Sequence, residues 1–278
     1  VTWWLTFNEQ NLYHMPETFL ISGYMRGDKT LRELYEIQHH VMMAHAHLTN
    51  YLHETKPGKL MGGMLAHAQV YPATCKPRDV FCAQQLDEFF NQNLLRVFAG
   101  EGYSPEVLHF VERAGFSDIY REEDLAVLAT MKNDYMAFSY YASRTLDSDP
   151  IPAGTPVNNY MLFGDKPNPH LKATEWNWQI DPLGFRSIIT RYYNDWRLPV
   201  FPIENGIGVI EHWDGENPIA DDYRIAYHRD HINAMKEAIF EDGAQVIGYL
   251  GWGLIDILSS QGDMRKRYGV VYVNRENH

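Results

Sequence analysis

Short apolar runs of strand length alternate along the chain with longer stretches in which apolar residues recur at helical spacing. The strand-like runs cover residues 2–7, 60–66, 135–141, 199–203 and 246–250, and the helix-like stretches cover residues 31–53, 80–98, 104–114, 184–196 and 222–239. Asp79 and the Asp221-Asp222 pair lie where acidic residues favour the start of the second and the last helix. This β-α-β-α order predicts parallel strands joined by crossover helices.

An acidic residue follows two of the strand-like runs: Glu9 lies two residues after the first run, and Glu204 directly follows the fourth. Active-site residues of a (β/α)8 barrel lie at the C-terminal ends of its strands, so the pattern favours this TIM-type fold. The alternative is a doubly wound open sheet, but no Gly-rich phosphate fingerprint follows the first run.

The number of strands is too small for a closed barrel. A barrel needs eight strands, whereas five are credible here, and the first begins at residue 2 without a preceding helix. No long helix follows the strand-like residues 270–273. We therefore expect one domain over residues 1–278 that supplies about the last five βα units of the barrel and lacks the first three.

Composition and charge are those of a soluble enzyme, with 45% hydrophobic residues and a formal net charge of -12. This charge argues against nucleic-acid binding, which needs a basic surface. The longest apolar stretch, residues 246–258, is interrupted by Asp256 and is too short and Gly-rich to cross a membrane. We expect no nucleic-acid partner and no membrane association.

Cysteine and histidine usage gives no indication of a metal site or a cofactor. Cys75 and Cys82 have no zinc-type spacing, so free thiols in a reducing compartment are expected. Four histidines lie within the amphipathic stretch 31–53, where a structural or solvated role is the better interpretation: His39, His40, His45 and His47.

Two short strings place a carboxylate beside an asparagine at the end of a strand-like run: Thr6-Phe7-Asn8-Glu9 and Ile203-Glu204-Asn205-Gly206. Either one alone could be an ordinary surface dipeptide. Glycoside hydrolysis needs a pair of carboxyl groups, one to protonate the leaving oxygen and one to attack the anomeric carbon or activate water. Together, at strand ends, the two strings indicate this chemistry.

The first string resembles the acid/base motif at the end of barrel strand 4 in glycoside hydrolase family 1, and the second resembles that family's nucleophile motif at the end of strand 7. The resemblance covers nearly the whole chain and includes Gln38-His39-His40, Tyr71-Pro72 and the stretch from Trp176 to Gly184. It implies a retaining double displacement through a covalent glycosyl-enzyme.

The resemblance also implies a role for each residue near the carboxyl pair. Glu204 would be the nucleophile and Glu9 the general acid and later the base, so Glu9 needs a raised pKa while Glu204 stays ionised. Retention requires the two carboxyls about 5 Å apart. Asn8 would bind the sugar 2-hydroxyl, and Tyr141 would hydrogen-bond the nucleophile. The alternative for Tyr141 is a packed strand aromatic.

Residues near the C-terminus resemble the phosphate-binding members of the family. Ser259 stands where plain β-glucosidases carry a glutamate, and Lys266 and Tyr268 match the Ser…Lys-x-Tyr phosphate clasp of 6-phospho-β-glycosidases. A hydroxyl and an ammonium bind a phosphate dianion that a carboxylate would repel. Lys266-Arg267-Tyr268 could instead be a solvated basic patch.

Further residues bear on the substrate. The 6-phospho-β-galactosidases place a tryptophan where this chain has the small Ser260, which favours a gluco-configured sugar. One residue fewer separates Ser259 from Lys266 than in most 6-phospho-β-glucosidases, which leaves open a reshaped loop in which Ser260 shares the role of Ser259. Trp178 resembles the aglycone-side tryptophan, and Trp252 belongs to the substrate-binding run Trp252-Gly253.

The expected function is a 6-phospho-β-glucosidase that acts on phosphorylated disaccharides such as cellobiose 6-phosphate in the cytoplasm, without metal or cofactor. The alternatives are a plain β-glucosidase and a catalytically incompetent carbohydrate-binding fragment. Sugar contacts that the family takes from strands 1 and 3 are absent from this chain. We therefore expect exposed strand edges and little activity unless the N-terminal barrel portion, or another copy of the chain, completes the site.

Overall fold

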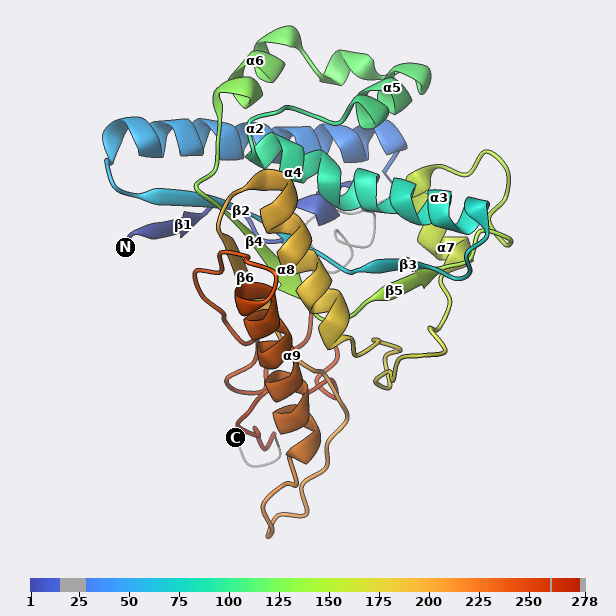
Figure 1. Cartoon of the computed structure of the whole chain (residues 1–278), viewed down its shortest axis with the longest axis vertical. Helices are drawn as coiled ribbons and strands as arrows, with labels where there is room; N and C mark the ends of the chain where they lie inside the picture. Colours follow the sequence, from blue (N-terminus) through green and yellow to red (C-terminus); the bar gives the residue numbers. More distant parts are fainter. Residues whose placement is uncertain (16–28, 261, 276–278) are drawn as a thin grey trace.

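A parallel sheet of four strands forms the centre of the computed structural model, which describes residues 1–15, 29–260 and 262–275. The strands lie in the order β1 (Trp3–Leu5), β2 (Leu60–Ala66), β4 (Tyr135–Tyr140) and β6 (Val200–Asn205) (Figure 1). All three pairings are parallel, as the β-α-β-α pattern predicted. A second parallel pair, β3 (Val70–Pro72) and β5 (Arg144–Leu146), was not predicted.

Helices connect the strands of the main sheet. They are α2 (Leu31–Thr55), α3 (Pro77–Asp87), α4 (Asn93–Phe98), α5 (Pro105–Arg113), α6 (Glu122–Thr130), α7 (Tyr160–Gly164), α8 (Pro182–Trp196) and α9 (Asp222–Phe240), with a π-helical turn η2 (Glu88–Gln92) and 3-10 turns η1 (Gln10–His14), η3 (Ser117–Ile119) and η4 (Val157–Asn159). The five predicted helical stretches are confirmed, whereas α6 and α7 were not predicted. None of the described helices has the length and apolar character needed to cross a membrane.

One predicted helix start is wrong. The residue that caps α3 is Lys76, and Asp79 lies inside the first turn, where its buried carboxylate accepts hydrogen bonds from the hydroxyls of Ser148 (2.5 Å) and Thr74 (2.7 Å). The helix starts earlier because Pro77 suits the first helical position. Asp221 does occupy the N-cap of α9.

The fifth predicted strand, residues 246–250, is not a regular strand. The segment still lies beside β6, because Ile247 N–H donates to the Val200 carbonyl and Leu250 N–H to the Pro202 carbonyl, at 3.0 Å each. Pro202 has no N–H to donate, so the ladder is interrupted at this point. Residues 270–273 are likewise reduced to a single parallel bridge, Ile255 with Val271.

The two faces of β4 separate the helices from the site. Met136, Phe138 and Tyr140 pack into the main core together with residues of α2, α4 and α8. Tyr135 and Ala137 point to the opposite face and pack with Met64 of β2. Because side chains alternate along a strand, this second face also carries Ser139.

The sheet is open among the described residues, with β1 at one edge (Figure 1). Trp3 and Trp4 on β1 are 45% and 43% exposed, and Leu254, Ile255 and Val270 near the C-terminal end are also exposed. These exposed edges agree with a partial barrel.

The cysteines and the buried histidines have the structural roles expected of them. Cys75 is exposed, Cys82 is buried, and both are free thiols. His39 shares a hydrogen bond with the Tyr103 hydroxyl, and His45 with the Asn133 side chain. Within the described ranges, no three His, Cys, Asp or Glu side chains are arranged to hold a metal ion.

Candidate active site

The two carboxyl residues of the predicted site lie at the C-terminal ends of parallel strands. Glu204 is the penultimate residue of β6, and its register partner on β4 is Ser139. Glu9 follows β1 and stands at the N-cap of η1 in the left-handed backbone region, with φ 42° and ψ 59°. Parallel strands bring these ends to the same edge of the sheet.

Ser139 links the two carboxyls. Its hydroxyl donates to Oε1 of Glu9 at 2.5 Å, while its backbone lies in register with Glu204. The sequence did not predict Ser139 as a site residue. The alternation of side chains along a strand could have indicated it, because Ser139 lies two residues after Ala137 and therefore on the same face of β4.

Tyr141 contacts the predicted nucleophile. Its hydroxyl donates to Oε2 of Glu204 at 2.6 Å. Burial, and then the negative charge of Glu204, hold the pKa of Tyr141 far above its usual range, so the phenol remains a donor. The hydrogen bond favours the ionised form of Glu204.

Burial raises the pKa of both carboxyls. For Glu204 the pKa rises to about 7, and the charge of Glu9 adds to the effect of burial while the Tyr141 hydrogen bond opposes it. Burial also raises the pKa of Glu9, against the hydrogen bond from Ser139. The sequence predicted a raised pKa for Glu9 and an ionised Glu204. Each carboxyl therefore holds its proton more strongly than a carboxyl in water does.

An aromatic cluster surrounds a lysine beside this pair. Tyr141 has its ring centroid 5.4 Å from that of Trp178 and 5.9 Å from that of Tyr268. The ammonium of Lys266 lies 3.1 Å from the centroid of the Trp178 ring, a close cation-π contact. The fold thus brings Lys266, Tyr268 and Trp178 together beside Tyr141, which binds Glu204.

Lys266 is a buried cation, 1% exposed. Burial, and then the positive charge of Arg144, lower its pKa to about 8. Although the negative charge of Asp263 raises this pKa, Asp263 is paired with Arg265, and Lys266 forms no ion pair with a carboxylate among the described residues. Lys266 is therefore not part of a solvated basic patch, and its burial favours the binding of an anion beside it.

Neither of the predicted serines forms a hydrogen bond with Lys266 among the described residues. Ser259 is buried, and its Oγ accepts from the N–H of Asp263 at 3.0 Å. Ser260 is exposed. The pairing of Ser259 with Lys266 and Tyr268 stays a prediction.

The remaining predicted residues flank Glu204 and Glu9. Trp252 donates its backbone N–H to the carbonyl of Asn205 at 2.9 Å, and a Cβ at Gly206 would lie 2.7 Å from the Trp252 carbonyl oxygen. The glycine of the second string is therefore required for this close approach. Asn8 is exposed beside Glu9.

Comparison with known proteins decides the family. The sequence matches Glycosyl hydrolase family 1 over residues 1–278. The chain belongs to glycosyl hydrolase family 1. This family 1 chain is 37% identical over 282 residues to the aryl-phospho-beta-D-glucosidase BglH of Bacillus subtilis (strain 168), covering 100% of the chain and 59% of that relative.

Other relatives of the family 1 chain carry related names. It is 36% identical over 288 residues to the 6-phospho-beta-glucosidase AscB of Escherichia coli (strain K12), covering all of the chain and 58% of AscB. A 6-phospho-beta-galactosidase of Leptotrichia buccalis is 30% identical over 298 residues, with 99% of the chain and 63% of that relative covered. The chain therefore spans about three fifths of the relatives' length.

Solved structures confirm the fold. The AHE enzyme from Alicyclobacillus herbarius superposes with a TM-score of 0.82 at 26% identity, over 99% of this chain and 60% of that one. The family 1 β-glucosidase from Thermotoga maritima gives a TM-score of 0.83 at 23% identity, over 98% of this chain and 59% of that one. The prediction of a partial (β/α)8 barrel is confirmed.

Proposed function

We propose that this family 1 chain carries the catalytic pair of a retaining 6-phospho-β-glucosidase. The observation that carries the proposal is Lys266, a buried ammonium without a carboxylate partner among the described residues, in one cluster with Tyr141 and Tyr268. A buried cation needs a counter-charge, and a substrate phosphate supplies it. The names of the relatives BglH and AscB support the same substrate class.

In the proposed first step, an oxygen of Glu204 attacks the anomeric carbon and forms a glycosyl ester while the bond to the leaving oxygen breaks. Glu9 gives its proton to that oxygen. In the second step the ionised Glu9 takes a proton from water, whose oxygen attacks the same carbon and releases Glu204. Tyr141 stabilises the carboxylate of Glu204 before attack and after release.

Substrate contacts are assigned from the same cluster. Lys266 and Tyr268 bind the phosphate, with Ser259 and Ser260 as further donors. Trp178 offers its face to the aglycone, Trp252 lies against the sugar, and Asn8 binds the 2-hydroxyl. A gluco-configured sugar is favoured over a galacto-configured one, because Ser260 is small.

The test compares an aryl β-glucoside with its 6-phosphate, using the protein translated from the complete reading frame. We expect the phosphorylated substrate to have the higher kcat/KM by at least about 100-fold, the value of one charge-assisted contact of roughly 3 kcal/mol. A preference for the unphosphorylated glucoside would support the plain β-glucosidase instead.

Barrel completion is the second part of the proposal. Residues 1–278 act as one domain whose open edges, at Trp4 and at Leu250, are covered by the N-terminal part of a family 1 barrel or by another copy of the chain. Because phosphorylated sugars arise during uptake into the cell, we propose a cytoplasmic location.

The open sheet also favours one different function, a non-catalytic carbohydrate-binding fragment. A 2-fluoro glycosyl fluoride that carries the 6-phosphate discriminates between the two. Covalent labelling at Glu204 supports the enzyme, whereas sugar binding without labelling supports the fragment.

A further inference from the structure

The backbone at Glu9 is held in an unfavourable conformation. Its φ of 42° lies in the left-handed region, which costs a non-glycine residue of order 1 kcal/mol. Such a conformation persists only where neighbouring contacts impose it. The contacts that do so begin at the next two residues, Gln10 and Asn11, which are 0% and 1% exposed.

Gln10 and Asn11 take the place of a missing stretch of strand. Pairing between β1 and β2 stops at Leu5 with Gly62, so the backbone of β2 beyond that point faces the turn. Gln10 accepts the N–H of Met64 through Oε1 at 3.2 Å. Asn11 accepts the N–H of Ala66 through Oδ1 at 2.8 Å and donates Nδ2 to the Ala66 carbonyl at 2.7 Å. Two side-chain amides thus fix the turn that carries Glu9.

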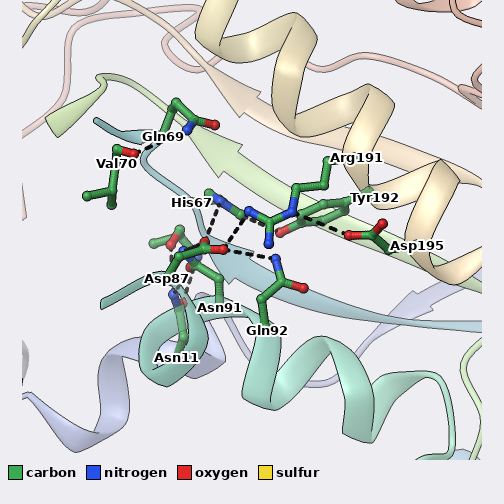
Figure 2. A network of polar contacts seen from close by, with 11 residues as sticks. Asn11, His67, Gln69, Val70, Asp87, Asn91, Gln92, Arg191, Tyr192 and Asp195 are labelled. Carbon is green, nitrogen blue, oxygen red and sulfur yellow. Dashed lines mark hydrogen bonds and ion pairs between the residues drawn. The ribbon is translucent and has the colours of Figure 1, made fainter. Parts of the chain in front are cut away.

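The amide of Asn11 is tied to a buried carboxylate (Figure 2). Its Nδ2 also donates to Oδ1 of Asn91 at 3.2 Å, and Nδ2 of Asn91 donates to Oδ1 of Asp87 at 2.9 Å. The backbone of Ala66 fixes the orientation of one amide, and the acceptor-only carboxylate of Asp87 fixes the other. The network therefore has a single donor-acceptor order.

Asp87 is held by hydrogen bonds from the π-helical turn η2 and from helix α8. The π-helical turn η2 lets both Asn91 and Gln92 reach it, the latter at 3.2 Å from Oδ2. From α8, Nη1 of Arg191 donates to the same Oδ2 at 2.6 Å (Figure 2). The turn after β1 is thus connected to the helices behind β2 and β4.

We propose that Asn11, held by Asn91 and Asp87, is a positioning residue that sets the carboxyl of Glu9 against the leaving oxygen of the substrate. The proposal rests on the function proposed above. Asn11 contacts β2 and η2, and it acts only through the backbone that it shares with Glu9. Proton donation is sensitive to such placement, because an error of 1 Å can cost about 100-fold in rate.

The test uses Asn11→Asp in the protein from the complete reading frame. The substitution keeps size but replaces the donor Nδ2 by an acceptor that faces the Ala66 carbonyl and Oδ1 of Asn91. Asn91→Asp tests the relay without touching the turn. Asn50→Asp is the matched control, since its amide donates to Thr130 on an exposed surface.

The readout is the dependence of kcat/KM on the leaving group of a 6-phospho-β-glucoside. Dinitrophenolate leaves without a proton, whereas an alkoxide or a sugar needs one from Glu9. For Asn11→Asp we expect a fall of about 30- to 100-fold with the basic leaving groups and less than about 3-fold with dinitrophenolate. For Asn91→Asp we expect kcat/KM to fall with the same dependence on the leaving group but by a smaller factor. For Asn50→Asp we expect the kcat/KM values of the parent.

An equal loss with all leaving groups, or no loss, would overturn the positioning role while leaving the proposed function intact. If the parent hydrolyses no glycoside, the proposed function fails, and crystal structures decide the positioning role. The proposal then requires that Asn11→Asp breaks the hydrogen bond from Ser139 to Glu9 while β2 and η2 stay in place. An unchanged bond between Ser139 and Glu9 would refute it.

Discussion

At the scale of single residues, three ionisable groups determine the behaviour of the site: the half-buried Glu9 and Glu204 and the buried Lys266. Glu9 and Glu204 have raised pKa values and Lys266 a lowered one, and burial is the first cause for each. Burial therefore disfavours the charged form of all three side chains. The phosphate of the proposed substrate would place an anion beside Lys266.

The pKa of Glu204 predicts a pH-dependent gain in stability from Glu204→Gln. Folding raises this pKa from 4.5 to about 7, so the carboxyl favours the folded state below pH 4.5 and loses that contribution as the pH rises through 7. Above pH 7 the variant should be more stable than the parent, by on the order of 1 kcal/mol. Urea unfolding at pH 5 and 8 measures this, with the exposed Glu122→Gln as control. An equal effect at both pH values would contradict the assignment.

Lys266→Met should remove selectivity for the phosphate. We expect KM for the 6-phosphoglucoside to rise about 100-fold, because a charge-assisted contact is lost, while the unphosphorylated glucoside is hydrolysed as before or slightly faster. Steady-state kinetics on both substrates measure this. Lys132→Met, at an exposed lysine, should leave both substrates unaffected. Equal losses on both substrates would place Lys266 in general folding rather than in phosphate binding.

At the scale of elements, the sheet depends on glycines at the centre of β2. A Cβ at Gly62 would lie 2.3 Å from the ring of Tyr135, and one at Gly63 would lie 2.5 Å from the ring of Phe98. The two rings pack against opposite faces of β2. Glycine leaves room for the ring of Tyr135 from β4 on one face of β2 and for the ring of Phe98 from α4 on the other.

Gly62→Ala should therefore destabilise the protein by about 2 kcal/mol, a typical cost of overpacking. Gly251→Ala is the matched control, since its Cβ would have no neighbour nearer than 3.8 Å. Thermal unfolding of both variants provides the measurement. If the two substitutions cost the same, contact with Tyr135 is not the cause.

At the scale of the whole molecule, the open sheet leaves apolar surface at both edges. Trp4 is 43% exposed on the edge strand β1, and Leu250 is 52% exposed in the segment 246–250 that lies beside β6 at the other edge. An unprotected edge strand invites pairing with another chain.

Residues 1–278, produced alone, should associate with themselves through this edge. Trp4→Lys should weaken the association by about 10-fold, because a charge on an edge strand opposes pairing. Sedimentation over a range of concentrations measures the effect. Leu48→Lys, an exposed apolar position on α2, is the control and should leave association unchanged. A monomer at all concentrations would refute the edge as an interface.

Local periodicity predicted the elements, because side-chain alternation and helical spacing are written in neighbouring residues. The runs at 60–66 and 135–141 became β2 and β4, and both carboxyl residues were found at strand ends. The small pair β3 and β5 was missed because three-residue strands carry almost no periodic signal. Residues 246–250 failed as a strand because Pro202, far away in sequence, interrupts the ladder.

The sequence by itself determined that this is a family 1 chain of parallel βα units with Glu9 and Glu204 at strand ends. The tertiary structure alone decided that Ser139 binds Glu9, that Lys266 lies on the Trp178 ring, and that Asn11 connects the turn after β1 to Asp87. The physical reason is the separation in sequence between the residues that interact. Secondary structure follows from neighbouring residues, whereas contacts between distant residues, and the burial that shifts the pKa values of Glu204 and Lys266, exist only once the strands and helices have packed.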